Sequence, residues 1–198
     1  MKEKIFNPKS PLALTINIIF DIFVLSILWF ISSLPIFTTG LAYSGLYYAI
    51  GDENPISVFI NTIKKNYKQG ILVDFIVLII LLLISWSMWI SYQMMVAGDF
   101  IAMVIFILGA IVLVIFIGYI TYLFPILAKY EYKTKELFEI CLKLSIKHIF
   151  FTIIISISLL LIVYFVYHFW IALFFIPAIF ALIHKSILEK ILLKHSKQ

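Results

Sequence analysis

The sequence has few charged residues, one cysteine and no arginine. Asp, Glu, Lys and Arg together make up 13% of its 198 residues, whereas hydrophobic residues make up 64%. Soluble domains contain about 25% charged residues, because their surfaces need groups that water solvates well. The scarcity of charge therefore excludes an ordinary soluble enzyme and a disordered chain, and it indicates an integral membrane protein. The lipid bilayer is thus the first partner that we expect.

The single cysteine and the missing arginine each exclude something further. Cys141 has no second cysteine with which to form an internal disulfide, so packing and backbone hydrogen bonds must hold the fold together. All 15 basic residues are lysines. Proteins that bind nucleic acid typically present a continuous basic face with arginine side chains, so no nucleic-acid partner is expected.

Long apolar runs are the main feature that the sequence does contain. A helix needs about 20 apolar residues to cross a bilayer, and five runs approach or exceed that length. A shorter run, 36–50, would extend roughly 22 Å as a helix, so it is either a thin sixth helix or a re-entrant segment. The sequence therefore predicts an all-α polytopic membrane bundle with about six membrane segments, one of them short, in a single domain, 1–198. The longer runs are 12–34, 71–96, 100–127, 149–167 and 169–188.

The lysines predict how these segments are oriented, because lysine is retained on the cytoplasmic side during insertion. If 36–50 returns the chain to its starting side, every lysine cluster lies in the cytoplasm, and the turns at Pro35, 97–99 and His168 carry no lysine. Tryptophan, which prefers the membrane interface, falls near the external ends. We therefore predict a multi-pass protein of the plasma membrane with both termini in the cytoplasm. The clusters are Lys2, Lys4 and Lys9; Lys64, Lys65 and Lys68; Lys129, Lys133, Lys135, Lys143 and Lys147; and Lys185, Lys190, Lys194 and Lys197.

Two polar connections have the pattern of amphipathic helices. In 54–70, apolar residues recur at helical spacing until Gly70, which is expected to stop the helix. In 134–148, Thr134 can cap the helix and Glu136 occupies the favourable first turn. Both segments are expected to lie at the cytoplasmic surface, where they could contact a protein partner or anionic lipid.

These two segments also resemble each other. Residues 59–68 align with residues 138–147 at a constant offset, with lysines and apolar residues in matching places. The alignment predicts a tandem repeat in which 36–97 and 100–167 each contain an inward span, a surface helix and an outward span. Chance similarity between two basic amphipathic helices would give the same alignment, so both explanations stay open.

A few polar residues fall within the apolar runs, where an ionisable group is costly. Asp21 lies well inside the first run, and Asn17 is one helical turn earlier on the same face. Together with His184 they are candidates for a polar intramembrane site. The alternative is a structural node that fixes helix packing through hydrogen bonds. Asp74 lies about one turn inside the second long run, where a reach back to the cytoplasmic interface would explain it.

The turn after the first run has a pattern of its own. Pro35 stops the helix, and Thr38 or Thr39 can cap the next one. Gly40 then permits close approach of the backbone. Free amides at such a helix start could receive an anion or a sugar hydroxyl, but a tight hairpin explains the same residues.

Two further prolines fall inside apolar runs. Pro125 and Pro177 each lack the N–H that a helix interior requires. Each is therefore expected to kink its helix.

The sequence contains no motif for catalysis or metal binding. Its histidines have no Cys, Asp or Glu partners at metal-ligand spacing, so a zinc site is not expected. It has no Walker loop, no G-x-S-x-G and no H-E-x-x-H. The sequence therefore predicts no catalytic residue, no metal and no cofactor.

Three blocks of sequence carry a family resemblance. The first reads LPIFTTG at 34–40 and follows Trp29, the second reads FINTIKKNYKQ at 59–69, and the third reads PILAK at 125–129. Together they resemble the YesL-like family of small bacterial integral membrane proteins, although Ser26 stands where that family typically has Asn. The resemblance brings no established biochemical activity. It implies a bacterial cell membrane and an association with carbohydrate uptake, in which ABC-transporter subunits would be partners.

These observations favour a non-enzymatic membrane protein that assists or regulates a solute uptake system by binding a partner. The alternative is a small transporter or channel in its own right, in which Asn17, Asp21 and His184 line a central path. A membrane enzyme would need paired carboxylates or a nucleophile with its base, and the sequence shows no such pair.

Overall fold

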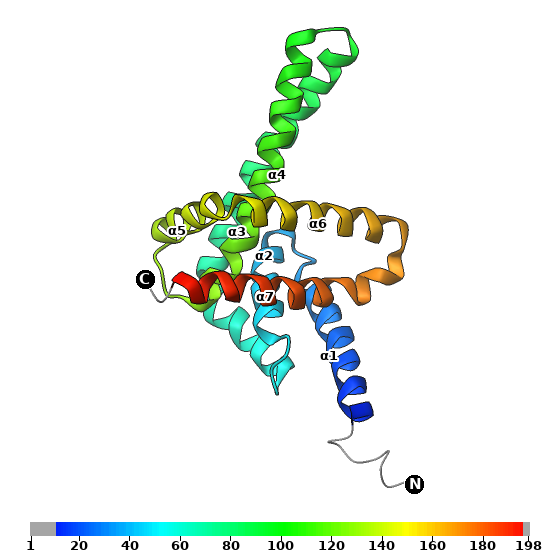
Figure 1. Ribbon diagram of the computed structural model, residues 1–198, viewed down its shortest axis with the longest axis vertical. Coiled ribbons are helices and arrows are strands. Elements are labelled where there is room, and N and C mark those ends of the chain that lie inside the picture. Colours follow the sequence, from blue (N-terminus) through cyan, green and yellow to red (C-terminus); the bar gives the residue numbers. More distant parts are fainter. Residues whose placement is uncertain (1–10, 196–198) are drawn as a thin grey trace. The chain divides into compact units, whose positions relative to one another are not determined.

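The computed structural model describes residues 11–195 and the side chains of residues 16–192. Over this range every regular element is helical, which confirms the all-α prediction (Figure 1). The predictions made for Lys2, Lys4, Lys9, Lys197 and the side chain of Lys194 lie outside the described residues. The helices are α1 (Pro11–Ser32), α2 (Thr39–Ala49), α3 (Pro55–Val96), α4 (Phe100–Lys129), α5 (Thr134–Lys147), α6 (Ile149–His168) and α7 (Ile176–His195), with short 3₁₀ helices η1 (Ile36–Thr38) and η2 (Trp170–Phe174).

Three of the described helices are long and apolar enough to cross a membrane. They are α3, α4 and α6, and the mean hydropathy of their most apolar stretches is 2.7, 3.4 and 2.9. A helix suits a bilayer because its backbone polar groups are satisfied within the helix itself. These three helices support the prediction of a membrane protein, which the composition also indicates. In addition, α1 contains a shorter apolar stretch, Ile16–Ser32.

The chain divides into two compact units. Unit 1 consists of Met1–Asn66 and Tyr164–Gln198, so it contains α1, α2, the start of α3, and α7. Unit 2 consists of Tyr67–Val163 and contains the rest of α3, then α4, α5 and most of α6. Each unit has buried residues of its own.

The core of unit 1 forms around α2. This helix packs against α1 and α7, and most of its residues are buried. Small residues allow the close packing, since a Cβ added at Gly45 would lie 3.1 Å from the Phe59 ring. The short apolar run 36–50 is therefore a 3₁₀ turn followed by a helix that protein encloses. The core comprises Leu25, Leu46, Ala49, Ile50, Phe59, Ala178 and Ala181.

In unit 2, α3 and α4 form a helical hairpin (Figure 1). Gly98 makes the turn with a φ of 95°, which glycine adopts without strain. Asp99 then caps α4, because its carboxylate accepts hydrogen bonds from the backbone N–H groups of Ile101 at 2.8 Å and Ala102 at 3.3 Å. The turn predicted at 97–99 is confirmed.

Both α5 and α6 pack against the later part of α4. The Tyr119 hydroxyl of α4 donates a hydrogen bond to the Phe138 carbonyl of α5 at 3.3 Å. At Gly118 the backbone comes so close to α6 that an added Cβ would lie 2.4 Å from both Ser156 Oγ and Thr152 Cγ2. Here α6 runs across α4 rather than alongside it (Figure 1).

The predicted helix end at Gly70 is wrong. Helix α3 continues from Pro55 to Val96, so the expected surface helix 54–70 and the apolar run 71–96 form one helix. A glycine inside a helix costs only about 1 kcal/mol relative to alanine, and strong helix formers on both sides offset it. Gly70 is also buried, where the lack of a side chain suits close packing.

The second amphipathic helix is confirmed as α5. Its start is stabilised by Glu136, whose carboxylate accepts a hydrogen bond from the Lys133 N–H at 3.3 Å; no cap by Thr134 is seen. One side of α5 is buried in unit 2, and this burial raises the pKa of the Cys141 thiol to about 12. The thiol therefore stays protonated and poorly reactive at neutral pH.

The two halves of the predicted repeat differ in where their helices break. Residues 36–97 contain α2 and the uninterrupted α3. Residues 100–167 contain α4, α5 and α6, with a break between the last two at His148. The tandem repeat stays a prediction.

Pro125 and Pro177 occupy different places in their helices. Pro125 lies inside α4, which continues to Lys129. Pro177 is the second residue of α7, where its fixed φ suits the first turn and its missing N–H has no partner to lose. The prediction that Pro177 kinks a helix is therefore wrong, because the residue helps to begin one.

Asp74 is a buried carboxylate in α3. Only 3% of its surface is exposed, and it interacts with another group of the protein. The prediction that the Asp74 side chain reaches back to the cytoplasmic membrane interface is therefore wrong. A carboxylate within an apolar run needs protein or water around it, and here protein surrounds it.

Candidate functional site

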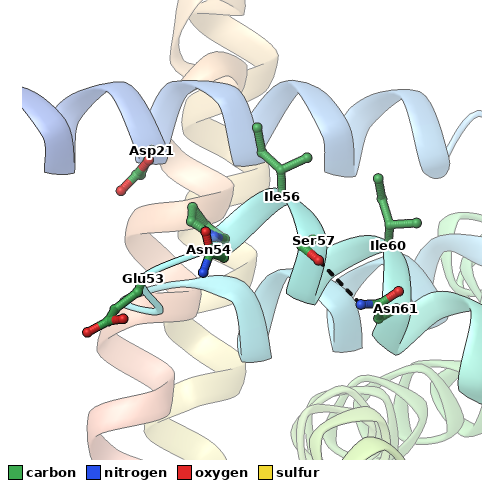
Figure 2. Close-up of a pocket in the computed structure, with 8 residues that line it drawn as sticks. Asp21, Glu53, Asn54, Ile56, Ser57, Ile60 and Asn61 are labelled. Carbon is green, nitrogen blue, oxygen red and sulfur yellow. Dashed lines mark hydrogen bonds between the residues drawn. The ribbon is translucent and has the colours of Figure 1, made fainter.

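A groove opens between α1 and the beginning of α3, within unit 1 (Figure 2). Its volume is about 530 Å³. Carboxylates, amides and a hydroxyl share its lining with apolar side chains, so it offers hydrogen-bond acceptors and negative charge to a bound group. The lining residues are Asp21, Glu53, Asn54, Pro55, Ile56, Ser57, Ile60 and Asn61.

The loop between α2 and α3 supplies one side of this groove. Gly51 turns the chain after α2 with a φ of 80°. The Asp52 carboxylate then accepts a hydrogen bond from the Asn54 N–H at 3.0 Å, and the Asn54 carbonyl accepts one from the Val58 N–H at 3.1 Å. These bonds fix the loop and the first turn of α3, which places Glu53 and Asn54 at the groove (Figure 2).

Asp21 reaches the groove from the middle of α1. Eleven residues separate it from the end of α1 at Ser32, or roughly 16 Å along the helix. Helix α2 packs against α1 and is itself 11 residues long, so it returns the chain to the level of Asp21. The carboxylate in the first apolar run therefore faces a polar loop (Figure 2).

The three residues of the predicted polar site occupy three different settings. Asp21 is half-buried at the groove, and Asn17 is exposed on α1. His184 lies on α7 and has 1% of its surface exposed. The groove lining comes from α1, the loop before α3 and α3 itself, so it does not include the histidine.

His184 is enclosed by aromatic rings in unit 1. Its Nδ1 lies 2.5 Å from the Tyr43 hydroxyl, and its ring stacks on Tyr43 and Phe180 with centroids 6.0 Å and 5.8 Å away. The Tyr47 ring meets it edge-on at 5.7 Å. Its Nε2 has no hydrogen-bond partner in the described part of the chain. This setting favours the structural alternative, in which the histidine fixes the packing of α7 against α2.

Two polar contacts that join helices of unit 1 could not be predicted from the sequence. The Lys185 Nζ donates a hydrogen bond to the Ile50 carbonyl at 2.8 Å, at the end of α2 where a cation suits the helix dipole. The Ser26 hydroxyl accepts one from the Ala178 N–H at 3.3 Å, in the first turn of α7. Both contacts join residues far apart in the chain, which no local spacing can indicate.

The turn at 35–40 uses its hydroxyls within the protein. Thr38 stands at the start of α2, but its Oγ1 lies 2.6 Å from the Ser32 carbonyl and 2.7 Å from the Pro35 carbonyl. Thr39 likewise donates to the Ile36 carbonyl at 2.9 Å. The prediction that a threonine side chain caps α2 is therefore wrong. With Gly40 also buried, the arrangement favours a tight hairpin over a ligand site.

No protein-family model, curated protein or solved structure matches this chain. The groove beside Asp21 is the feature best suited to binding, because Asp21 and Glu53 can each accept hydrogen bonds from a cationic or hydroxyl-bearing group.

Proposed function

We propose that this chain is a non-enzymatic integral membrane protein that assists a solute uptake system, with carbohydrate as the solute, by binding one of the system's subunits. The resemblance of 34–40, 59–69 and 125–129 to the YesL-like family supports the association with uptake. The three long apolar helices support its placement in a bilayer. In this proposal the chain is a binding partner of the transport machinery and carries out no reaction itself.

The observation that carries the proposal is the open groove of unit 1. An accessory protein needs a surface that a partner can reach, and Glu53 and Asn54 are exposed at this groove. Asp21 lies half-buried on its other side, where a partner's side chain would exclude water from the carboxylate. A charge pair that is shielded from water contributes more than one at an exposed surface. A basic or hydroxyl-rich segment of a partner subunit fits this lining.

The positions of the three predicted polar residues favour this function over transport. A small transporter or channel would need Asn17, Asp21 and His184 along one path. In unit 1, Asp21 opens to a groove and Asn17 is exposed, whereas His184 is enclosed by aromatic rings.

We further propose six membrane segments, one of them short, with both termini in the cytoplasm of a bacterial cell. The clustered lysines support this topology, because the turns at Pro35, 97–99 and His168 carry none. Because α6 runs across α4 rather than alongside it, α6 is the segment whose span most needs a direct test, and His168 at its end is the position to probe.

Single cysteines would test this topology in intact cells. Ala97→Cys and His168→Cys are expected to react with a membrane-impermeant maleimide, because both positions would face outward. Asp52→Cys and Lys135→Cys are expected to react only after permeabilisation. The native Cys141 is buried and serves as an unreactive background. Protection of His168→Cys until permeabilisation would remove α6 as a membrane span.

Affinity purification in a mild detergent would test the proposed partner. We expect the chain to recover a membrane subunit of an uptake system, and the double variant Asp21→Asn/Glu53→Gln to recover at least tenfold less, which corresponds to about 1.4 kcal/mol. The loss is expected because the groove would no longer offer negative charge to the partner.

Glu139→Gln is the matched control, since it removes an exposed carboxylate from α5, in unit 2. It should recover the partner as well as the unmodified chain does. Failure of the unmodified chain to recover any uptake subunit, under conditions that preserve known complexes, would contradict the proposal.

A further inference from the structure

Helix α4 changes from exposed to buried at one point, Gly118. Residues 100–117 expose apolar side chains along most of their length, whereas nearly every residue from Gly118 to Leu127 is buried. A similar change occurs along α3, where Val77 is the last of the buried apolar residues. Between 78 and 117 the sequence contains one charged residue, Asp99 at the turn.

The exposed hairpin 78–117 has the length of a bilayer. At 1.5 Å per residue, 78–96 and 100–117 each extend about 27–28 Å. The hydrocarbon core of a bilayer is about 30 Å thick. If the Asp99 turn lies at one membrane surface, the other surface falls close to Gly118.

Helix α5 lies at the level where the exposed hairpin ends. Tyr119 follows Gly118, and its hydroxyl donates to the Phe138 carbonyl of α5 at 3.3 Å, with the two rings 6.3 Å apart. Leu137 and Cys141 of α5 are buried. One side of α5 therefore packs on the base of the hairpin.

The rest of α5 has an apolar side and a charged side. Leu142 and Ile146 are one helical turn apart and expose 52% and 63% of their surfaces. Lys143 points about 60° around the helix from Ile146. The charged side comprises Glu136, Lys143 and Lys147, and the exposed Glu139 lies between it and the apolar side. The exposed Lys135, in the first turn, points to the same side as Leu142 and Ile146, where its long apolar stem lets the ammonium group reach the headgroups.

We propose that α5 lies along the bilayer surface at the base of the hairpin, with Leu142 and Ile146 inserted among the lipid chains and Lys143 and Lys147 beside the phosphates of anionic lipid. The three sides of the helix then meet three matching environments, namely protein, lipid and the charged headgroup layer. Interfacial helices place their apolar face about 5–10 Å into this boundary and their lysines against anionic headgroups. The proposal concerns unit 2, so it stands apart from partner binding at the groove of unit 1.

Spin labels on the full chain, reconstituted into phosphatidylcholine vesicles with phosphatidylglycerol, would test this placement. A nitroxide at Ile146→Cys is expected to collide with oxygen rather than with an aqueous nickel chelate, because oxygen concentrates in lipid. The matched label at Lys143→Cys, three residues away, should show the opposite preference, and the oxygen-to-nickel ratio should differ several-fold. Burial of Cys141 leaves the native thiol unlabelled.

Other outcomes would identify another occupant for this face. Equal access of nickel to both labels would overturn the proposal, and a label at Leu142→Cys guards against a local disturbance at the first position. Protection that requires an added cytoplasmic protein would assign the face to a protein partner. Omission of phosphatidylglycerol should lower the ratio at Ile146→Cys, and an unchanged ratio would contradict the role of anionic lipid.

Discussion

Gly118→Ala is expected to destabilise unit 2 by about 3 kcal/mol, at the upper end of the usual range for an overpacked contact. The added Cβ would lie 2.4 Å from Ser156 Oγ and only 2.7 Å from the Thr152 backbone oxygen. A side chain can rotate away, but a backbone oxygen cannot, so α6 must move relative to α4. Thermal unfolding in detergent should show a Tm lower by roughly 6–12 °C.

Gly109→Ala is the matched control on the same helix. Its added Cβ would lie 3.0 Å from Met88 Cγ, which belongs to a flexible side chain that can adjust. We therefore expect its Tm to stay close to that of the unmodified chain. Hydrogen exchange should show lost protection in α4 and α6 for Gly118→Ala alone. An equal loss in both variants would mean that helix α4, and not its contact with α6, is sensitive to the substitution.

Local signals in the sequence predicted most of the helices. Long apolar runs and turn residues act over a few positions, which is why the turn at 97–99 and the amphipathic helix α5 are confirmed. The course of the chain at Gly70 and Pro177 depends on what surrounds each residue. Gly70 is buried within a continuous helix, and Pro177 begins a helix after a 3₁₀ turn. Spacing alone cannot distinguish a glycine inside a helix from one that ends it, or a proline that begins a helix from one that kinks it.

The candidate site was partly predictable for the same physical reason. A carboxylate in an apolar run is costly wherever the run is located, so Asp21 could be identified from sequence alone. Its companions Glu53 and Asn54 come from a loop that α2 carries back to the same level, and nothing in their spacing indicates this. His184 was also identified by its polarity, but its aromatic surroundings, including Tyr43, appear only in the folded chain.

Lys185→Met is expected to destabilise unit 1 by about 2 kcal/mol, the usual contribution of a hydrogen bond to a charged group. The substitution keeps most of the apolar stem but removes the donor to the Ile50 carbonyl at 2.8 Å. It also removes a cation from the end of α2, where the helix dipole is negative. The Tm should fall by roughly 4–8 °C, with lost protection from hydrogen exchange in α2 and α7.

Lys190→Met is the control, because Lys190 is exposed on the same helix. It should leave the Tm nearly unchanged, and a fall equal to that of Lys185→Met would show that lost charge, not the lost contact, is responsible. Lys185 also belongs to the lysine cluster that predicts a cytoplasmic C-terminus, so its loss could act on membrane orientation as well. Accessibility of Asp52→Cys in the Lys185→Met background separates the two effects. A thiol that stays protected in intact cells, together with a lowered Tm, would assign the effect of Lys185 to the packing of α7 on α2.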